Sequence, residues 1–382
     1  MSNFTSRPVL RWAVPAAAAV AVVGAGVAAK TLAVAAEPDL PPRTAAQLLV
    51  DLQTARLDGL SGTVVERADL GLPAIPLLTG DQSAKLTSLV SGKHTLRVWY
   101  SGPDKGRVSL LGTQGQSDVI HNGNDTWIWD SQTKEAQHFT GQPEKDKTGG
   151  PGVPGVPGVL ASPSDLPKSP QEAADLALKA IDPTTQVTTG NSAKIAGRNA
   201  YELILRPRDT SSLVGEVRLA IDAQQKLPLR VQVLPRGTAN PAFEVAFTQV
   251  SFARPDDAEF TFNPPAGTKV TEQDPAKTHQ EQQDKAQQHN GGAADKPKST
   301  VIGTGWTSVL VLRTSDGAQG ASAEEQKKAQ DAIAQLPQGS GGRTFNSKLV
   351  SVLFTGDGRV LIGSVTPERL TQVAADPAAA LK

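Results

Sequence analysis

Apolar and polar residues alternate along the chain from residue 94 to residue 140. In the first run, Leu96 and Val98 fall on one face of a predicted strand, whereas Arg97 and Trp99 fall on the other. The alternation resumes after short polar gaps at 107–111, 117–121, 126–130 and 136–140. Asn-Gly separates two of these runs, and this dipeptide favours a tight hairpin. The pattern therefore predicts an antiparallel meander with short connections.

Helical spacing appears in two other places. Residues 42–58 carry alanines and leucines three and four positions apart, and Thr44 is a suitable N-cap. An S-x-x-E capping box at 169–172 begins a second apolar stripe, which ends near residue 182. Further alternating runs predict strands at 61–70, 193–207, 216–235 and 243–265. Together these patterns predict an α+β fold built on an antiparallel sheet.

Two segments interrupt this pattern. Residues 141–170 contain seven prolines, which predicts a flexible loop; a lid over a cavity mouth is the alternative. Residues 271–300 have no Val, Ile, Leu or aromatic residue, so we expect a disordered linker. Residues 301–370 then predict a strand, a helix and a hairpin turning at Asp357-Gly358, which together form a small C-terminal α+β unit. With 382 residues, two folded domains are expected, at 40–270 and 301–370.

The N-terminus predicts export. Arg7 and Arg11 precede an uncharged apolar run from Trp12 to Ala29, and Ala33-Val34-Ala35 resembles a cleavage site. Residues 1–36 therefore fit a secretory signal peptide. The run is also long enough for an uncleaved helix that anchors the chain in the cytoplasmic membrane. Either reading places the rest of the chain outside that membrane, in the cell envelope, secreted or tethered.

Composition narrows the function further. Basic and acidic residues number 38 each, so the formal net charge is zero, which does not favour nucleic acid as a partner. Cysteine is absent, which excludes disulfides, thiolate metal sites and a lipid-modified N-terminal cysteine. The five histidines lack helical metal-site spacing, and we expect His121 and His138 to face solvent on strands. The acidic residues Asp256, Asp257 and Glu259 predict a solvated turn.

No nucleophile, phosphate-binding or dinucleotide-binding motif occurs in the sequence. We therefore expect no enzyme activity, no cofactor and no metal. Trp127 and Trp129 are the most distinctive candidates for binding, because both lie on one face of a predicted strand. An ordinary aromatic core and an aromatic-lined pocket for an apolar ligand both explain such a pair. The tentative lipid-binding residues are Trp99, Leu111, Trp127, Trp129 and Phe139.

The order of these features resembles the LolA-like superfamily, which includes the lipoprotein carrier LolA, the LppX-type proteins and the N-terminal domain of RseB. The resemblance spans about residues 40–270 and rests on stretches such as AAQLLVDLQTARLDGLSGTVVER, LRVWYSGPDKGRVSLL and VIHNGNDTWIWD. It implies a curved antiparallel sheet that forms a half-open barrel covered by helices. In such proteins the inner face is apolar and binds acyl chains.

The resemblance implies two functions. One is an extracytoplasmic carrier that binds a lipid or lipoprotein acyl chain; burying about 16 carbons offers roughly 12 kcal/mol before ordering costs. The other is an RseB-like regulator that binds a membrane-bound anti-sigma factor. The two-domain layout is closer to the regulator, because the carrier is a single domain. A structural envelope protein whose interior is filled by its own side chains is a third possibility.

Overall fold

The computed structural model describes residues 40–71, 92–112, 115–141, 183–273, 300–313 and 323–379. The predicted signal or anchor, the proline-rich loop, the predicted helix ending near residue 182 and nearly all of the predicted linker lie outside these ranges. Within them, no helix combines the length and the apolar character that crossing a bilayer requires.

The first described element is helix α2 (Ala45–Thr54). Thr44 caps it as predicted: its side chain accepts from the Gln47 backbone N–H, and the Gln47 side chain accepts from the Thr44 N–H in return. The helix ends four residues earlier than the sequence pattern suggests. Ala55 takes an extended conformation, and Leu57 packs instead against the core that begins at Leu60.

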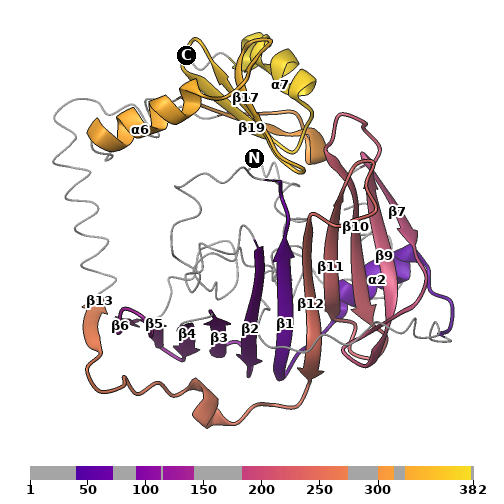
Figure 1. Ribbon diagram of the computed structural model, residues 1–382. Coiled ribbons are helices and arrows are strands. Elements are labelled where there is room, and N and C mark those ends of the chain that lie inside the picture. Colours follow the sequence, from indigo (N-terminus) through magenta and orange to yellow (C-terminus); the bar gives the residue numbers. More distant parts are fainter. Residues whose placement is uncertain are drawn as a thin grey trace, which may run out of the picture.

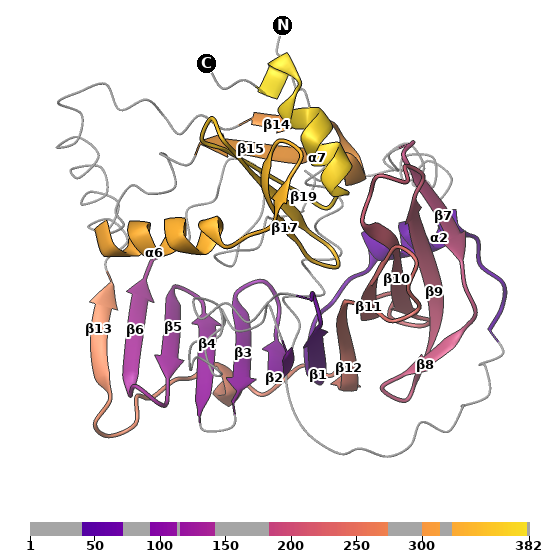
Figure 2. The same cartoon turned by 45° about the horizontal axis from the view of Figure 1, so that its top comes forward.

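A 13-stranded sheet forms most of the molecule (Figures 1 and 2). Along the sheet the order is β13-β6-β5-β4-β3-β2-β1-β12-β11-β10-β9-β7, and β8 also pairs with β9. The strands are β1 (Leu60–Ala68), β2 (Gly92–Tyr100), β3 (Lys105–Leu111), β4 (Gln116–Asn122), β5 (Asp125–Asp130), β6 (Glu135–Thr140), β7 (Thr185–Thr189), β8 (Ala193–Ile195), β9 (Arg198–Pro207), β10 (Val214–Asp222), β11 (Pro228–Pro235), β12 (Phe243–Ser251) and β13 (Lys269–Gln273).

The sheet is almost wholly antiparallel, and its predicted meander is confirmed from β2 to β6. Gly123 turns the β4–β5 hairpin with a φ of 64°, a conformation that favours glycine. The pairing of β13 with β6 is parallel. β13 takes in residues 271–273, which the composition had assigned to the linker. The path ends at β13 and β7 and does not close on itself in the described part of the chain.

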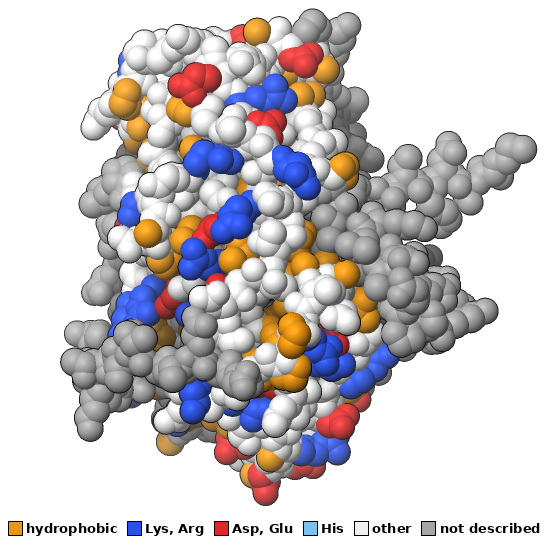
Figure 3. All heavy atoms as spheres, turned by 90° about the vertical axis from the view of Figure 1, so that its right-hand side faces the viewer, with side chains coloured by type: hydrophobic (Ala, Val, Ile, Leu, Met, Phe, Trp, Pro, Cys, Tyr) orange, Lys and Arg blue, Asp and Glu red, His pale blue; other side chains and the backbone are white. Residues whose placement is uncertain are grey.

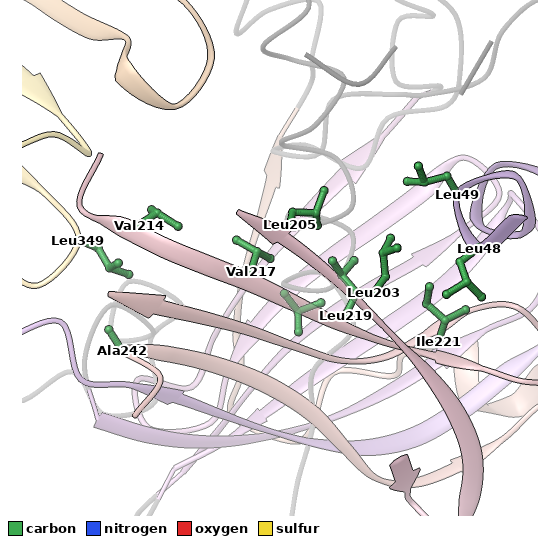
Figure 4. Close-up of a cluster of buried hydrophobic side chains, with 11 residues drawn as sticks. Leu48, Leu49, Leu203, Leu205, Val214, Val217, Leu219, Ile221, Ala242 and Leu349 are labelled. Atoms are coloured by element: carbon green, nitrogen blue, oxygen red, sulfur yellow. The ribbon is translucent and has the colours of Figure 1, made fainter. Parts of the chain in front are cut away.

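The sheet has two chemically different faces, which we call inner and outer. Leu203, Leu219, Val231 and Val245 are register partners on four neighbouring strands and define the inner face. All four are at most 3% exposed. Figure 4 shows that Leu203 and Leu219 lie on the same side of the sheet as the leucines of α2, so this helix packs against the inner face.

The outer face of the same strands is charged. Arg230 pairs with Glu202 across β11 and β9, and Arg67 pairs with Glu244 across β1 and β12. Figure 3 shows basic side chains interspersed with acidic ones on the side of the molecule that carries β7 and β9. This half of the sheet therefore follows the apolar-inside, polar-outside alternation of an antiparallel sheet with one solvated face.

In the meander, the outer face is covered by residues 252–268, which we call the strap. It runs beneath β2 to β6 in Figure 1, on the side away from the C-terminal unit, and leads into β13. The predicted strand at 243–265 stops at Ser251. Pro255 cannot donate to a ladder, and Asp256 caps a short 3-10 helix, η3 (Asp257–Phe260), by accepting from Ala258 N–H.

The C-terminal unit is a six-stranded sheet in the order β14-β15-β19-β18-β17-β16. Its described elements are β14 (Thr300–Ile302), η4 (Gly305–Thr307), β15 (Val309–Arg313), α6 (Ala323–Ala334), β16 (Gln338–Gly339), β17 (Gly342–Asn346), β18 (Ser351–Thr355), β19 (Arg359–Gly363), α7 (Pro367–Ala374) and η5 (Pro377–Ala379). The predicted hairpin turns at Gly358, with a φ of 80°. Leu353, Leu361 and Leu370 form a core of their own, each 0% exposed.

This unit packs on the large sheet. The indole Nε1 of Trp306 donates to Thr185 Oγ1 at 2.7 Å, and Leu349 joins the apolar cluster that contains the α2 leucines. Ser212 forms a β-bridge with Val365. The two sheets therefore meet through backbone, apolar and polar contacts together.

Candidate functional site

The inner face of the meander carries a row of apolar side chains, which is unusual for a sheet face in contact with solvent. Val98, Val108, Val119 and Ile128 are direct partners on β2, β3, β4 and β5. Val98 is 4% exposed, and exposure increases along the row to 39% at Ile128. Since the strap already covers the other face of these strands, a purely structural sheet would present polar residues here. The row is therefore a candidate surface for an apolar ligand.

A second feature of the inner face is the carboxyl of Glu66. In the register, Glu66 lies between Val245 on β12 and His94 on β2, at the end of the buried row that begins at Leu203. The residue is 2% exposed, and neither carboxylate oxygen has a hydrogen-bond partner. Burial raises the pKa of this carboxyl to about 8, so it is mostly protonated at pH 7.

The tryptophan pair lies on the opposite, outer face. Phe262 of the strap contacts both indoles, with ring centroids 5.2 Å from Trp127 and 5.8 Å from Trp129. Trp129 Nε1 is buried without a hydrogen-bond partner. This packing accounts for both tryptophans as the core between meander and strap.

His138 completes that core. Its ring stacks on Trp127 at a centroid distance of 3.9 Å and an interplanar angle of 9°. Its two ring nitrogens lie 3.0 Å from Asp125 Oδ1 and 2.7 Å from Glu272 Oε2. The side chain is only 16% exposed, so the prediction that it faces solvent is wrong. The parallel pairing of β13 with β6, which the sequence pattern did not indicate, supplies Glu272. His121 lies on the inner face and bonds to Thr126 instead.

Arg107 connects the outer face to the strap. It pairs with the buried carboxylate of Asp118 at 2.6 Å and donates to the Glu259 carbonyl at 3.1 Å. Its guanidinium lies 5.2 Å from the centre of the Trp99 ring, a cation–π arrangement. The hydrogen bond to Glu259 holds the strap, and the ion pair with Asp118 joins β3 to β4.

The five residues proposed from the sequence thus separate by face. Trp99, Leu111, Trp127 and Trp129 lie on the outer face, whereas Phe139 lies on the inner face because it pairs with Thr126. The structure does not bring all five together on one surface. The register partner of Ile128 on β6 is the polar Gln137, and Phe139 lies on the same face two residues farther along that strand.

Sequence reasoning missed both the row and Glu66. Val119 and Ile128 could have indicated the row, since they share the face opposite the tryptophans. The site was instead assigned to Trp127 and Trp129 because tryptophan is rarer in the sequence. Glu66 interrupts an otherwise apolar register row, which becomes visible only when β1, β12, β11 and β10 are aligned.

The acidic group at 256–259 has structural partners: Asp257 pairs with Lys105 at 2.8 Å, and Asp256 caps η3. Within the described ranges, no cluster of three or more His, Asp or Glu side chains is arranged to hold a metal ion.

No family model and no curated protein matches the chain. Several solved structures are similar to it. The complex of MucA and MucB from Pseudomonas aeruginosa has 17% identity and a TM-score of 0.40, covering 86% of this chain and 96% of that chain. An uncharacterized conserved protein from Thermus thermophilus has 10% identity and a TM-score of 0.33, with 59% and 98% covered. A LolA superfamily protein from Nitrosomonas europaea has 11% identity and a TM-score of 0.22, with 58% and 99% covered.

Proposed function

We propose that this protein works outside the cytoplasmic membrane and binds the acyl chain of a lipid or lipoprotein on the inner face of its large sheet. The observation that carries the proposal is the row Val98–Val108–Val119–Ile128, which is apolar yet increasingly exposed. Each methylene that moves from water onto such a surface contributes about 0.8 kcal/mol. Binding of this kind needs an apolar surface and no catalytic group.

The proposal is tested with a fluorescent fatty acid and the full chain. We expect Ile128→Asp to weaken binding about tenfold or more, because it places a charge against the acyl chain and removes about 1.5–3 kcal/mol of apolar contact. Trp127→Phe is the matched control, one residue away on the outer face. Equal affinity for Ile128→Asp and the unaltered chain would contradict the proposal. Weaker binding by Trp127→Phe alone would indicate that the ligand binds at the tryptophans instead.

A regulator that binds a membrane-bound anti-sigma factor is the second candidate. The packing of a second sheet against the first supports it, because the resemblance associates a two-domain layout with RseB and a single domain with the carrier. Native mass spectrometry that detects co-purified lipid favours the carrier. Recovery of an identified anti-sigma factor from envelope extracts, absent when residues 300–382 are deleted, favours the regulator.

A further inference from the structure

Strand β13 forms one end of the large sheet, beside β6 (Figure 2). Its pairing with β6 is parallel, which is slightly less stable per residue than antiparallel pairing. Residues 269–272 are all exposed, Val270 by 40%. Lys269 pairs with Glu135 at 3.2 Å, but both side chains are more than half exposed, so this pair contributes little. Among the described side-chain contacts, that of Glu272 is therefore the one best able to hold β13.

Glu272 contacts His138, whose ring lies between two carboxylates. Glu272 Oε2 is 2.7 Å from Nδ1, and Asp125 Oδ1 is 3.0 Å from Nε2. A carboxylate accepts hydrogen bonds, so both ring nitrogens must carry a proton if both contacts are hydrogen bonds. Only the imidazolium has two N–H groups, because the neutral ring turns a lone pair toward one of the two oxygens. The geometry therefore requires the charged form of His138.

The surroundings of the ring also favour that form. The described charged groups that face it are Asp125 from β5 and Glu272 from β13, both acidic. The indole of Trp127 stacks on the ring at 3.9 Å, an arrangement that attracts a cation to the indole face. The strap and β4 contribute the uncharged residues Phe262 and Ile120, which adjoin Trp127.

We infer that protonation of His138 controls the attachment of β13 to the large sheet. In its charged form the ring donates to both carboxylates and so joins β5, β6 and β13. When the ring loses one proton, it loses one of these hydrogen bonds and the ionic attraction to both carboxylates. β13 then keeps its parallel backbone pairing and the exposed Lys269 pair. Because β13 continues from the strap, its release also frees the end of the strap.

The pH dependence has a definite sign. The attachment requires a protonated ring and ionised carboxylates, so it weakens as pH rises through the titration of the ring and also as pH falls through that of the carboxylates. Ordinary histidines titrate at about pH 6.5 and ordinary carboxyl groups at about pH 4. The informative comparison is therefore pH 5.5 against pH 8.5.

Hydrogen exchange of the amides in residues 269–273 of the full chain, corrected for the intrinsic effect of pH, measures the attachment. We expect protection of these amides to be about tenfold lower at pH 8.5 than at pH 5.5, because one hydrogen bond to a charged group is lost. Amides of β10 serve as the internal reference and should not show this change. In ¹⁵N-labelled histidine spectra, His138 should have both ring nitrogens protonated at pH 5.5.

Variants assign the effect to the two partners. His138→Phe keeps a ring on Trp127 without N–H groups and should give the same low protection at both pH values. Glu272→Gln removes the charge on β13 and should lower protection at pH 5.5 toward the level at pH 8.5. Lys269→Gln, on the same strand, is the matched control and should retain the tenfold change.

Three results would overturn the role of His138. One is equal protection of residues 269–273 at pH 5.5 and pH 8.5 in the unaltered chain. Another is a neutral ring at pH 5.5. The third is a tenfold change that persists in His138→Phe or, should that variant fail to fold, in Glu272→Gln.

Discussion

Glu66 makes the stability of the protein depend on pH in an unusual direction. Its folded pKa is about 8, against 4.5 for an ordinary glutamate. Below pH 4.5 the carboxyl is protonated in both states and contributes nothing. Between pH 4.5 and 8 it ionises only in the unfolded state, so folding loses stability as pH rises, by on the order of 4 kcal/mol in total. Above pH 8 the loss is complete.

We therefore expect Glu66→Gln to be more stable than the unaltered chain at pH 9, by a few kcal/mol, and nearly equal to it at pH 4.5. Urea unfolding at pH 4.5, 7 and 9 measures the difference. Glu244→Gln removes a carboxylate from the outer face and should show no such growth with pH. If the difference in unfolding free energy between Glu66→Gln and the unaltered chain stayed the same at all three pH values, Glu66 would ionise normally in the folded state.

At the scale of elements, the strap explains why the meander has aromatic residues on its outer face. Without it, Trp127 and Trp129 would stand on an exposed sheet surface; with it, Phe262 packs over both. The strap is held by Arg107 and by Lys105, which bonds to Asp257. Its conformation is thus fixed by side chains of β3.

Replacing Phe262 with alanine should loosen the strap. Phe262 is half-buried, so its loss should cost less than the about 3–5 kcal/mol of a fully buried ring, and the two indoles would become more accessible to water. We expect the tryptophan emission to shift to longer wavelength and acrylamide quenching to increase, whereas Phe262→Leu should cause a much smaller change. Unaltered emission in Phe262→Ala would mean that the strap does not shield these rings.

The elements were largely predictable from sequence, whereas the assignment of faces was not. Period-two alternation located β2 to β6, and the capping box located the start of α2, because both depend on neighbours in the chain. The 3-10 helix η3 and the parallel strand β13 depend on residues far away: η3 packs on β3 and β4, and β13 needs β6 as a partner. The same holds for Glu66, whose isolation results from strands that are almost 180 residues apart.

For the molecule as a whole, the notable feature is the contact between the two sheets. Trp306 binds Thr185 and packs on the inner-face cluster, while Lys348 pairs with Asp69 at 2.6 Å near the end of β1. The hydrogen bond from Lys348 lowers the pKa of the exposed Asp69 carboxyl. Because that pair is exposed, the apolar contact of Trp306 and Leu349 should account for most of the stability of this interface.

Trp306→Ala should therefore separate the unfolding of the two sheets. Each retains its own core, the six-stranded unit through Leu353, Leu361 and Leu370, but loss of the half-buried indole removes packing between them, by less than the about 3–5 kcal/mol of a fully buried ring. We expect the single calorimetric transition of the unaltered chain to divide into two in Trp306→Ala. Trp306→Phe keeps an aromatic ring and loses the hydrogen bond, and it should retain one transition.

Because the contact joins the inner-face cluster that contains the α2 leucines, an acyl ligand bound to that face should move the two transitions of Trp306→Ala closer together. Two transitions already present in the unaltered chain would show that the units fold independently, and a regulatory role that depends on their contact would then lose its structural basis.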